Sequence, residues 1–149
     1  MLRLRVQLQA DLRMKEKQHV LFVCVGNSGR SQMAEAFAKK LGLQVSSAGT
    51  APAKTVSPVA VQLMQEKGID ISSNKPKMLT KEMIEEASLV VTMGCSVEAV
   101  CPAPMLAKMQ KKLVDWGLED PKGKPIEEIR RIRDEIERRV VELSQKEKA

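Results

Sequence analysis

Aromatic side chains are almost absent from the sequence. Its 149 residues include no tyrosine and only Phe22, Phe37 and Trp116. Proteins that bind single-stranded nucleic acid commonly stack the bases on aromatic rings, so the composition argues against that class of function. Without large rings, the interior must be filled by aliphatic side chains and by the nine methionines.

The sequence also lacks a long hydrophobic run. No stretch approaches the roughly 18 apolar residues that a membrane-spanning helix needs, and the basic N-terminus has no apolar signal-peptide core. We therefore predict a cytoplasmic protein with no membrane partner. The net charge is +6, and the first 18 residues supply half of it, with five basic residues against two acidic ones. The remaining excess suits an anionic substrate and does not require nucleic acid.

Histidine and cysteine are scarce. The single histidine, His19, precedes Cys24 by five residues along a predicted strand, which is too far for it to act as a base toward that cysteine. Three cysteines and one distant histidine lack the Cys-x2-Cys spacing of zinc sites, so we expect no metal and no cofactor. An odd number of cysteines favours thiol chemistry over a structural disulfide framework.

The hydrophobic pattern predicts one α/β domain over residues 19–149, preceded by an N-terminal extension of residues 1–18, of which we expect residues 1–13 to have no catalytic part. Apolar segments and helix-capping signals alternate along the chain. The predicted strands are residues 20–24, 43–47, 88–93 and 112–114, and the predicted helices are residues 32–40, 58–68, 80–87 and 126–143. This alternation predicts a three-layer fold, a four-stranded parallel sheet flanked by helices with flavodoxin-like winding. Ligands of such sheets bind at the carboxyl ends of the strands.

The first strand leads into a loop suited to a tetrahedral anion. Val20–Val23 is a continuous apolar run that ends at Cys24, and an amphipathic helical pattern begins at Gln32. The backbone N–H groups of the loop and of the helix N-terminus should therefore converge above Cys24. The candidate oxyanion-binding residues are those between the cysteine and the helix, namely Val25, Gly26, Asn27, Ser28, Gly29, Arg30 and Ser31.

Individual loop residues have distinct expected roles. We expect Gly26 and Gly29 to allow positive φ and close approach of the backbone to an anion, and Asn27 to tolerate left-handed geometry. The planar guanidinium of Arg30 can bind two oxygens of one anion. This cationic setting should lower the pKa of Cys24 below about 8.5, so that a thiolate can act as the nucleophile, with Ser31 donating to the sulfur.

These residues carry a family resemblance. CVGNSGRS resembles the Cys-x5-Arg-Ser signature of the low-molecular-weight protein tyrosine phosphatase superfamily, which includes thioredoxin-coupled arsenate reductases that detoxify arsenic. The similarity runs from about Val20 to the C-terminal helix. The resemblance implies a phosphatase-like fold, an arsenate or phosphate-like oxyanion as substrate, and catalysis by Cys24 and Arg30.

A carboxylic acid is expected in the loop after the fourth strand. Asp120 precedes Pro121, which restricts its backbone, and it could protonate a leaving oxygen as Cys24 attacks. The superfamily's general acid is an Asp-Pro in the corresponding loop, which supports Asp120. Asp115 and Glu119 are nearby competitors for this role.

Cys95 and Cys101 distinguish two enzyme classes. A phosphatase needs only Cys24, Arg30 and Asp120, whereas a reductase needs two further thiols for disulfide exchange. Arsenate reductases of this superfamily carry two cysteines in the same loop. The resemblance then implies that Cys95 attacks the adduct on Cys24, that Cys101 attacks Cys95, and that thioredoxin reduces the final disulfide. We predict this reductase, with a phosphatase that hydrolyses phosphate monoesters through a phosphocysteine as the alternative.

The sequence departs from the superfamily's pattern at several positions. Gly29 replaces a common cysteine. Some of the reductases bind potassium through residues matching Asn27, Glu35 and Ser47, but the remaining carboxylate position corresponds to Lys77 here. We therefore expect no potassium site. The aromatics with which tyrosine-type phosphatases hold a phenyl ring are also missing, which favours the reductase.

Overall fold

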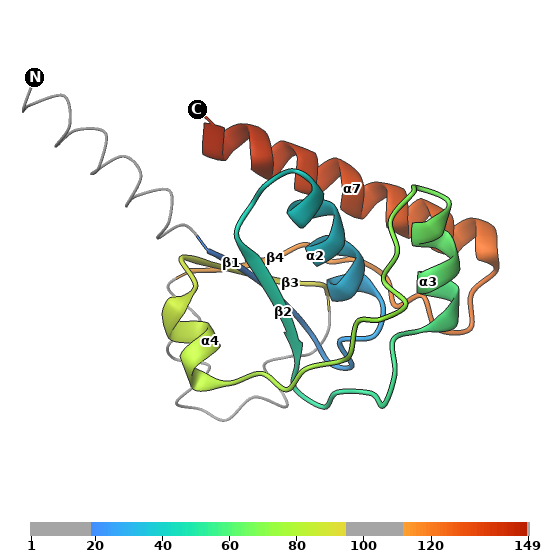
Figure 1. The fold of residues 1–149 in the computed structure, drawn as a ribbon, viewed down its shortest axis with the longest axis horizontal. Helices are drawn as coiled ribbons and strands as arrows, with labels where there is room; N and C mark the ends of the chain where they lie inside the picture. The colour runs from blue at the N-terminus through green and yellow to red at the C-terminus, as the bar shows by residue number, and fades with distance from the viewer. Residues whose placement is uncertain (1–18, 95–111, 149) are drawn as a thin grey trace, which may run out of the picture.

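The computed structural model describes residues 19–94 and 112–148. Its sheet contains four parallel strands in the order β2-β1-β3-β4, as Figure 1 shows. The strands are β1 (Val20–Cys24), β2 (Val45–Gly49), β3 (Leu89–Thr92) and β4 (Leu113–Asp115). The predicted α/β architecture with a four-stranded parallel sheet is confirmed, and the carboxyl ends of the strands lie at one edge.

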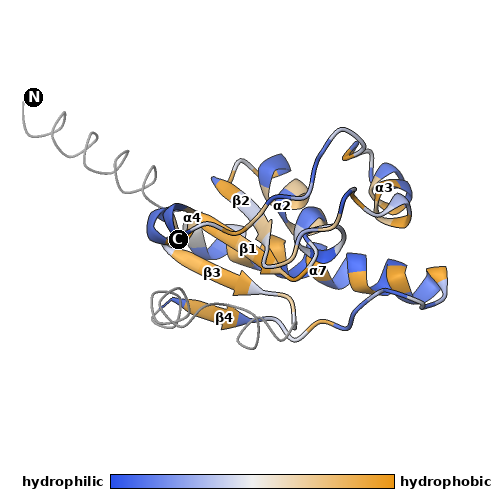
Figure 2. Ribbon diagram, turned by 90° about the horizontal axis from the view of Figure 1, so that it is seen from below, coloured by the Kyte–Doolittle hydropathy of each residue, from blue (hydrophilic) through white to orange (hydrophobic). Residues whose placement is uncertain are grey.

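The described helices are α2 (Arg30–Lys40), α3 (Pro58–Gln65), α4 (Lys81–Glu86) and α7 (Ile126–Lys148). Helices cover both faces of the sheet because the side chains of β1 alternate between two apolar clusters. Phe22 and Cys24 pack in the cluster that includes residues of α2 and α7, whereas Leu21 and Val23 pack with Ile84 of α4. Figure 2 shows apolar residues along the strands and hydrophilic residues on the outer sides of the helices.

The predicted caps are present. The Ser57 side chain accepts a hydrogen bond from the Ala60 N–H at 3.4 Å, and the Thr80 side chain accepts one from the Met83 N–H at 3.2 Å. In the part of the chain that the structure describes, no helix is both long enough and apolar enough to cross a membrane.

The second strand was predicted two residues too early. Its start at Leu43 is wrong because the Leu43 N–H donates to the Ala38 carbonyl at 3.0 Å, which closes the end of α2. Its end at Ser47 is wrong because Ala48 and Gly49 still pair with Val23 and Cys24 of β1. The other strand boundaries differ by one residue at most, and α2 begins two residues before Gln32. The shift of β2 brings Gly49 beside the functional loop.

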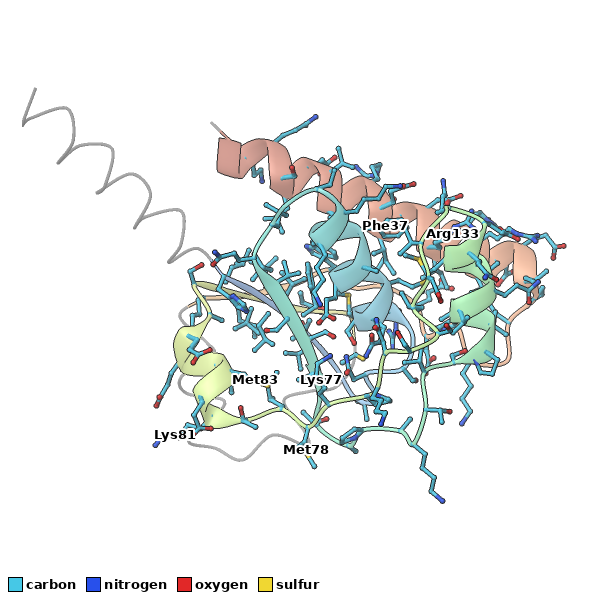
Figure 3. The ribbon with its side chains drawn as sticks, viewed as in Figure 1. Phe37, Lys77, Met78, Lys81, Met83 and Arg133 are labelled. Atoms are coloured by element: carbon cyan, nitrogen blue, oxygen red, sulfur yellow. The ribbon has the colours of Figure 1, made fainter. Side chains whose placement is uncertain are left out.

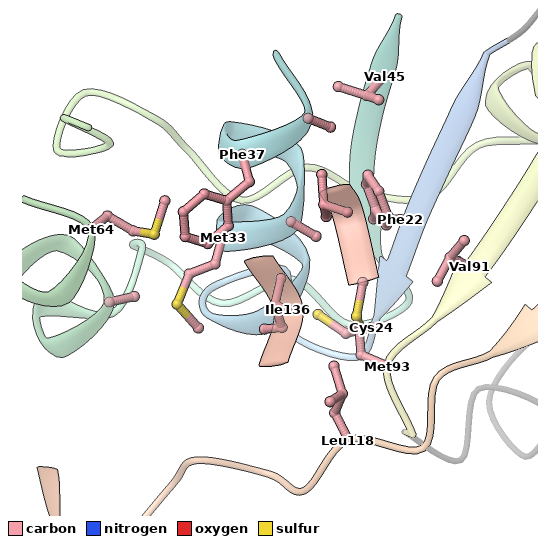
Figure 4. Close-up of a cluster of buried hydrophobic side chains, with 14 of the residues drawn as sticks. Phe22, Cys24, Met33, Phe37, Val45, Met64, Val91, Met93, Leu118 and Ile136 are labelled. Atoms are coloured by element: carbon pink, nitrogen blue, oxygen red, sulfur yellow. The ribbon is translucent and has the colours of Figure 1, made fainter. Parts of the chain in front are cut away.

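Methionines fill much of the interior, as the scarcity of aromatics predicts. Met33, Met64 and Met93 are fully buried, and Figure 4 shows Met93 beside Cys24 at the end of β1, Met33 on α2 and Met64 further away at α3. Unbranched thioether side chains fit irregular spaces of this kind well. Phe22 and Trp116 make the one described aromatic pair, with their ring centroids 5.6 Å apart.

The C-terminal helix is joined to α3 by a buried arginine. The Arg133 Nη1 donates to the Leu63 carbonyl at 2.9 Å and to Glu66 Oε1 at 2.7 Å, and its side chain is 7% exposed. Arg130 donates to the same carboxylate from the exposed side, at 2.8 Å. Figure 3 shows Arg133 where α7 passes α3. Glu66 therefore couples the two helices through two guanidinium groups.

Acid should weaken this coupling. Hydrogen bonds from Arg130 and Arg133 hold the pKa of Glu66 at about 2, below its ordinary value of 4.5. A carboxyl whose pKa is lowered by folding stabilises the fold above pH 4.5 and loses that contribution as the pH falls toward 2. We expect Glu66→Gln to lower the urea midpoint at pH 7 by more than at pH 3. Glu86→Gln, at an exposed position at the end of α4, should change the midpoint little at either pH. An equal loss at both pH values for Glu66→Gln would contradict the prediction.

Candidate active site

A loop between β1 and α2 surrounds the sulfur of Cys24; we call residues 24–31 the anion loop. Cys24 ends β1 and is only 4% exposed, close to Met93 and Leu118 in Figure 4. Its Sγ accepts a hydrogen bond from the Asn27 N–H at 3.1 Å and lies 2.9 Å from Ser31 Oγ. Two hydrogen-bonding groups thus reach the sulfur, an arrangement that favours a thiolate over a neutral thiol.

Within the anion loop, the residue with a left-handed backbone conformation is Asn27. Asn27 has a φ of 48° and is fully buried, as its short amide side chain allows. Positive φ at Gly26 and Gly29 was wrongly predicted: Gly29 has a φ of −134°, and Gly26 is also outside the positive-φ region. The loop places its reversal at Asn27 because this side chain can bond to the surrounding elements, which glycine cannot do.

The Asn27 amide links the loop to α2, to β2 and to the segment before α4. Its Nδ2 donates to Ser31 Oγ at 2.8 Å and to Ser47 Oγ at 3.0 Å. Its Oδ1 accepts from the Lys77 N–H at 2.9 Å, and this backbone donor fixes which end of the amide is oxygen. Ser31 therefore accepts from Asn27, which leaves the Ser31 hydroxyl hydrogen available to the Cys24 sulfur.

Gly49 is a site residue that the sequence did not reveal. A Cβ at this position would lie 2.5 Å from the Val25 carbonyl oxygen and 3.0 Å from the Asn27 nitrogen. The contact is with backbone atoms that cannot move without distorting the anion loop, so only glycine fits. Ala48 and Gly49 directly follow the predicted second strand, but the sequence does not show that they pair with β1 beside the loop.

Arg30 begins α2 and is oriented by two carbonyl groups. Its Nη1 donates to the Met93 carbonyl at 2.7 Å and to the Leu118 carbonyl at 2.9 Å. These carbonyls follow β3 and β4, so the guanidinium ties the anion loop to both. Gly94 allows this approach, because a Cβ there would lie 2.5 Å from the Leu118 oxygen.

A cavity of about 820 Å³ opens above the anion loop. Its lining includes Cys24 and Arg30 from the loop region, Ser57 and Val59 at the start of α3, and Asp120 from the loop after β4. Lys122 and Lys124 also line it, so among the described lining residues three side chains are cationic and only Asp120 is acidic. This charge balance suits an anionic ligand.

Of the three acids considered for proton transfer, only Asp120 lines this cavity. Asp115 Oδ1 instead accepts hydrogen bonds from Thr92 Oγ1 at 3.0 Å and from the Gly94 N–H at 2.8 Å. Glu119 forms an ion pair with Lys124 at 3.0 Å. The structure therefore brings Asp120 to the same cavity as Cys24 and gives the other two acids structural contacts.

The remaining predicted site residues form two groups, those that line the cavity and those outside the described residues. Val25, Gly26, Ser28 and Gly29 line the cavity with Cys24. Cys95 and Cys101 lie outside the described residues, and Gly94, the last residue before that segment, lines the cavity. Within residues 19–94 and 112–148, no three His, Cys, Asp or Glu side chains are grouped to hold a metal ion.

Comparison with known proteins places the chain among related enzymes. Residues 19–149 match the family described as low molecular weight phosphotyrosine protein phosphatase. An arsenate reductase from Brevibacillus brevis is 41% identical over 135 residues, which cover 89% of this chain and 98% of the relative.

Solved structures give the same fold. The YwlE arginine phosphatase from Geobacillus stearothermophilus superposes with a TM-score of 0.78 at 31% identity and covers 88% of this chain and 93% of its own. The thioredoxin-dependent arsenate reductase from Corynebacterium glutamicum superposes with a TM-score of 0.69 at 37% identity, over 87% of this chain and 61% of its own.

Proposed function

The chain belongs to the low molecular weight phosphotyrosine protein phosphatase family, and within that family we propose that it is an arsenate reductase that uses Cys24 as its nucleophile. The observation that carries the proposal is the hydrogen-bonded sulfur of Cys24 beneath a cationic cavity. The sequence relative from Brevibacillus brevis, an arsenate reductase, supports this activity over ester hydrolysis.

In the first step, arsenate occupies the anion loop. The loop N–H groups and the Arg30 guanidinium bind its oxygens, and Asp120 faces the oxygen that leaves. The Cys24 thiolate attacks arsenic, a sulfur–arsenic bond forms, and one oxygen departs as water after it takes up protons, for which Asp120 is the general acid.

In the second step, the arsenic is reduced. The Cys95 thiolate attacks the Cys24 sulfur, the sulfur–arsenic bond breaks, and its electron pair stays on arsenic, which leaves as arsenite. Cys101 then attacks Cys95 and releases the Cys24 thiolate, so that two thiols have supplied the two electrons. Thioredoxin would reduce the resulting disulfide, by analogy with the thioredoxin-dependent enzyme of similar fold.

Disulfide mapping tests this relay. After reaction with one equivalent of arsenate, the unmodified protein should hold a disulfide between Cys95 and Cys101. Cys101→Ser should trap one between Cys24 and Cys95, and Cys95→Ser should form neither. Turnover with thioredoxin should fall at least about a hundredfold in both variants, because the exchange has no second route.

The control for this experiment is Ser96→Ala, which changes the same segment without removing a thiol and should turn over normally. Full arsenate turnover in both cysteine variants would show that the relay is wrong.

A phosphatase is the second candidate function. Cys24, Arg30 and Asp120, the three residues that phosphocysteine chemistry needs, line one cavity, and an arginine phosphatase has a similar fold. Fast hydrolysis of a phosphate monoester by the Cys95→Ser/Cys101→Ser double variant, without arsenate reduction by the unmodified protein, would favour this candidate.

A further inference from the structure

Outside the lining of the cavity, α2 carries a buried carboxylate. The side chain of Glu35 is 5% exposed and lies between two lysines. Lys39 Nζ lies 3.3 Å from Oε1, and Lys77 Nζ lies 3.6 Å from Oε2. An uncompensated carboxylate in such a place is costly, so at least one of these ammonium groups must neutralise it.

The two lysines differ in what else they contact. Lys39 stands one turn after Glu35 on α2, and 62% of its side chain is exposed. Lys77 comes from the segment before α4 and lies beside β2 in Figure 3. Its Nζ also lies 3.5 Å from Ser47 Oγ, and its backbone N–H donates to Asn27 Oδ1 at 2.9 Å. Only Lys77 joins the carboxylate to the residues that shape the anion loop.

A continuous set of contacts leads from Lys77 to the nucleophile. Lys77 Nζ and Asn27 Nδ2 both donate to Ser47 Oγ, which fixes the position of the Asn27 amide. The same Nδ2 donates to Ser31 Oγ, which lies 2.9 Å from the Cys24 sulfur. The Asn27 N–H reaches that sulfur directly, at 3.1 Å.

We propose that Lys77 is a positioning residue for the Cys24 thiolate. Its ammonium neutralises Glu35 and donates to Ser47 Oγ, which also accepts from the Asn27 amide. This holds Asn27 so that Ser31 and the Asn27 N–H donate to the sulfur. Without it, the buried Glu35 carboxylate keeps only the exposed Lys39 as a counter-ion, and Ser47 loses one of the two donors that fix its hydroxyl beside the Asn27 amide. The proposal rests on the reactive role of Cys24 in the proposed function.

Thiol reactivity measures this role without arsenate. In a Cys95→Ser/Cys101→Ser background, the rate of iodoacetamide alkylation of Cys24 is followed against pH. Lys77→Met should move the midpoint of this profile upward by about half a unit to one unit, since the thiolate loses electrostatic support. Lys77→Arg, which keeps the charge, should move it less. Lys77→Met combined with Glu35→Gln should return it toward the starting value, because the carboxylate no longer needs a counter-ion.

Lys39→Met is the matched control. It removes a positive charge from the same carboxylate without touching Ser47 or Asn27, and its midpoint should stay within about 0.2 of a unit, a bound set by its exposure to solvent. An unchanged midpoint in Lys77→Met, a shift as large in Lys39→Met, or a shift that Glu35→Gln does not reverse would each overturn the proposal. A protein in which Cys24 titrates as expected but arsenate is not reduced would instead contradict the proposed function alone.

Discussion

Replacing Cys24 with serine is expected to abolish arsenate reduction, with a loss of about 10⁴-fold or more. Removal of a covalent nucleophile is among the largest effects that one substitution can have on an enzyme. The sulfur of Cys24 is hydrogen-bonded by the Asn27 N–H and lies beside Ser31, whereas a serine hydroxyl stays protonated at neutral pH. Serine can also form no disulfide, so both the attack and the reduction are lost. Thioredoxin-coupled turnover with excess arsenate measures the effect.

Binding should survive the same change. The N–H groups of the anion loop and the Arg30 guanidinium remain in place, and serine is close in size to cysteine. We expect Cys24→Ser to bind inorganic phosphate within about threefold of the unmodified protein by titration calorimetry, because the donors and not the sulfur hold the anion. Turnover above a hundredth of the normal rate would show that another residue is the nucleophile.

The sequence contained enough information to predict the fold and the local part of the site. The apolar run that ends at Cys24 and the helical spacing after Gln32 predict a strand, a loop and a helix in close succession, and this order is a local property of the chain. The asparagine at position 27 was expected in left-handed geometry, and its φ of 48° confirms this. Signals within a dozen residues are therefore readable without a structure.

The contacts that complete the site were not readable in this way. Arg30 is held by the carbonyls of Met93 and Leu118, which lie 63 and 88 residues further along the chain. Backbone carbonyls carry no residue-type signal, so no pattern could have identified them. Gly49 lies beyond the predicted end of the second strand at Ser47, and the sequence does not show that the Val25 carbonyl approaches it. Sheet pairing between distant segments brings these atoms together.

The role of the Lys77 side chain became apparent only from its contacts in the structure. In the sequence, Lys77 was a departure at a carboxylate position, and its only consequence was that no potassium site is expected. In the structure, its ammonium lies within 3.6 Å of Glu35 and within 3.5 Å of Ser47. The Lys77 side chain therefore places its own positive charge between the oxygen atoms of Glu35 and Ser47.

Replacing Arg30 with lysine is expected to weaken binding of inorganic phosphate at least about a hundredfold, although the charge is kept. A guanidinium can bind two oxygens of a tetrahedral anion, and each charge-assisted hydrogen bond contributes roughly 1.5–3 kcal/mol. Lysine offers a single ammonium without the planar fork. It also cannot reproduce the paired bonds to the Met93 and Leu118 carbonyls, so the loops after β3 and β4 lose their shared tie to the anion loop.

Lys122→Met tests whether the loss of phosphate affinity in Arg30→Lys comes from the geometry of the guanidinium or from the positive charge of the cavity. Lys122 lines the same cavity from the loop after β4 but lies outside the anion loop, so its loss should weaken phosphate binding only a few-fold. Titration calorimetry of both variants at one salt concentration measures the difference, and circular dichroism checks that each is folded. If Lys122→Met lost as much phosphate affinity as Arg30→Lys, the anion would be held by the summed positive charge of the cavity and not by one side chain. A hundredfold gap between them would mean instead that it is held by the geometry of one guanidinium, fixed by two carbonyls from distant parts of the chain.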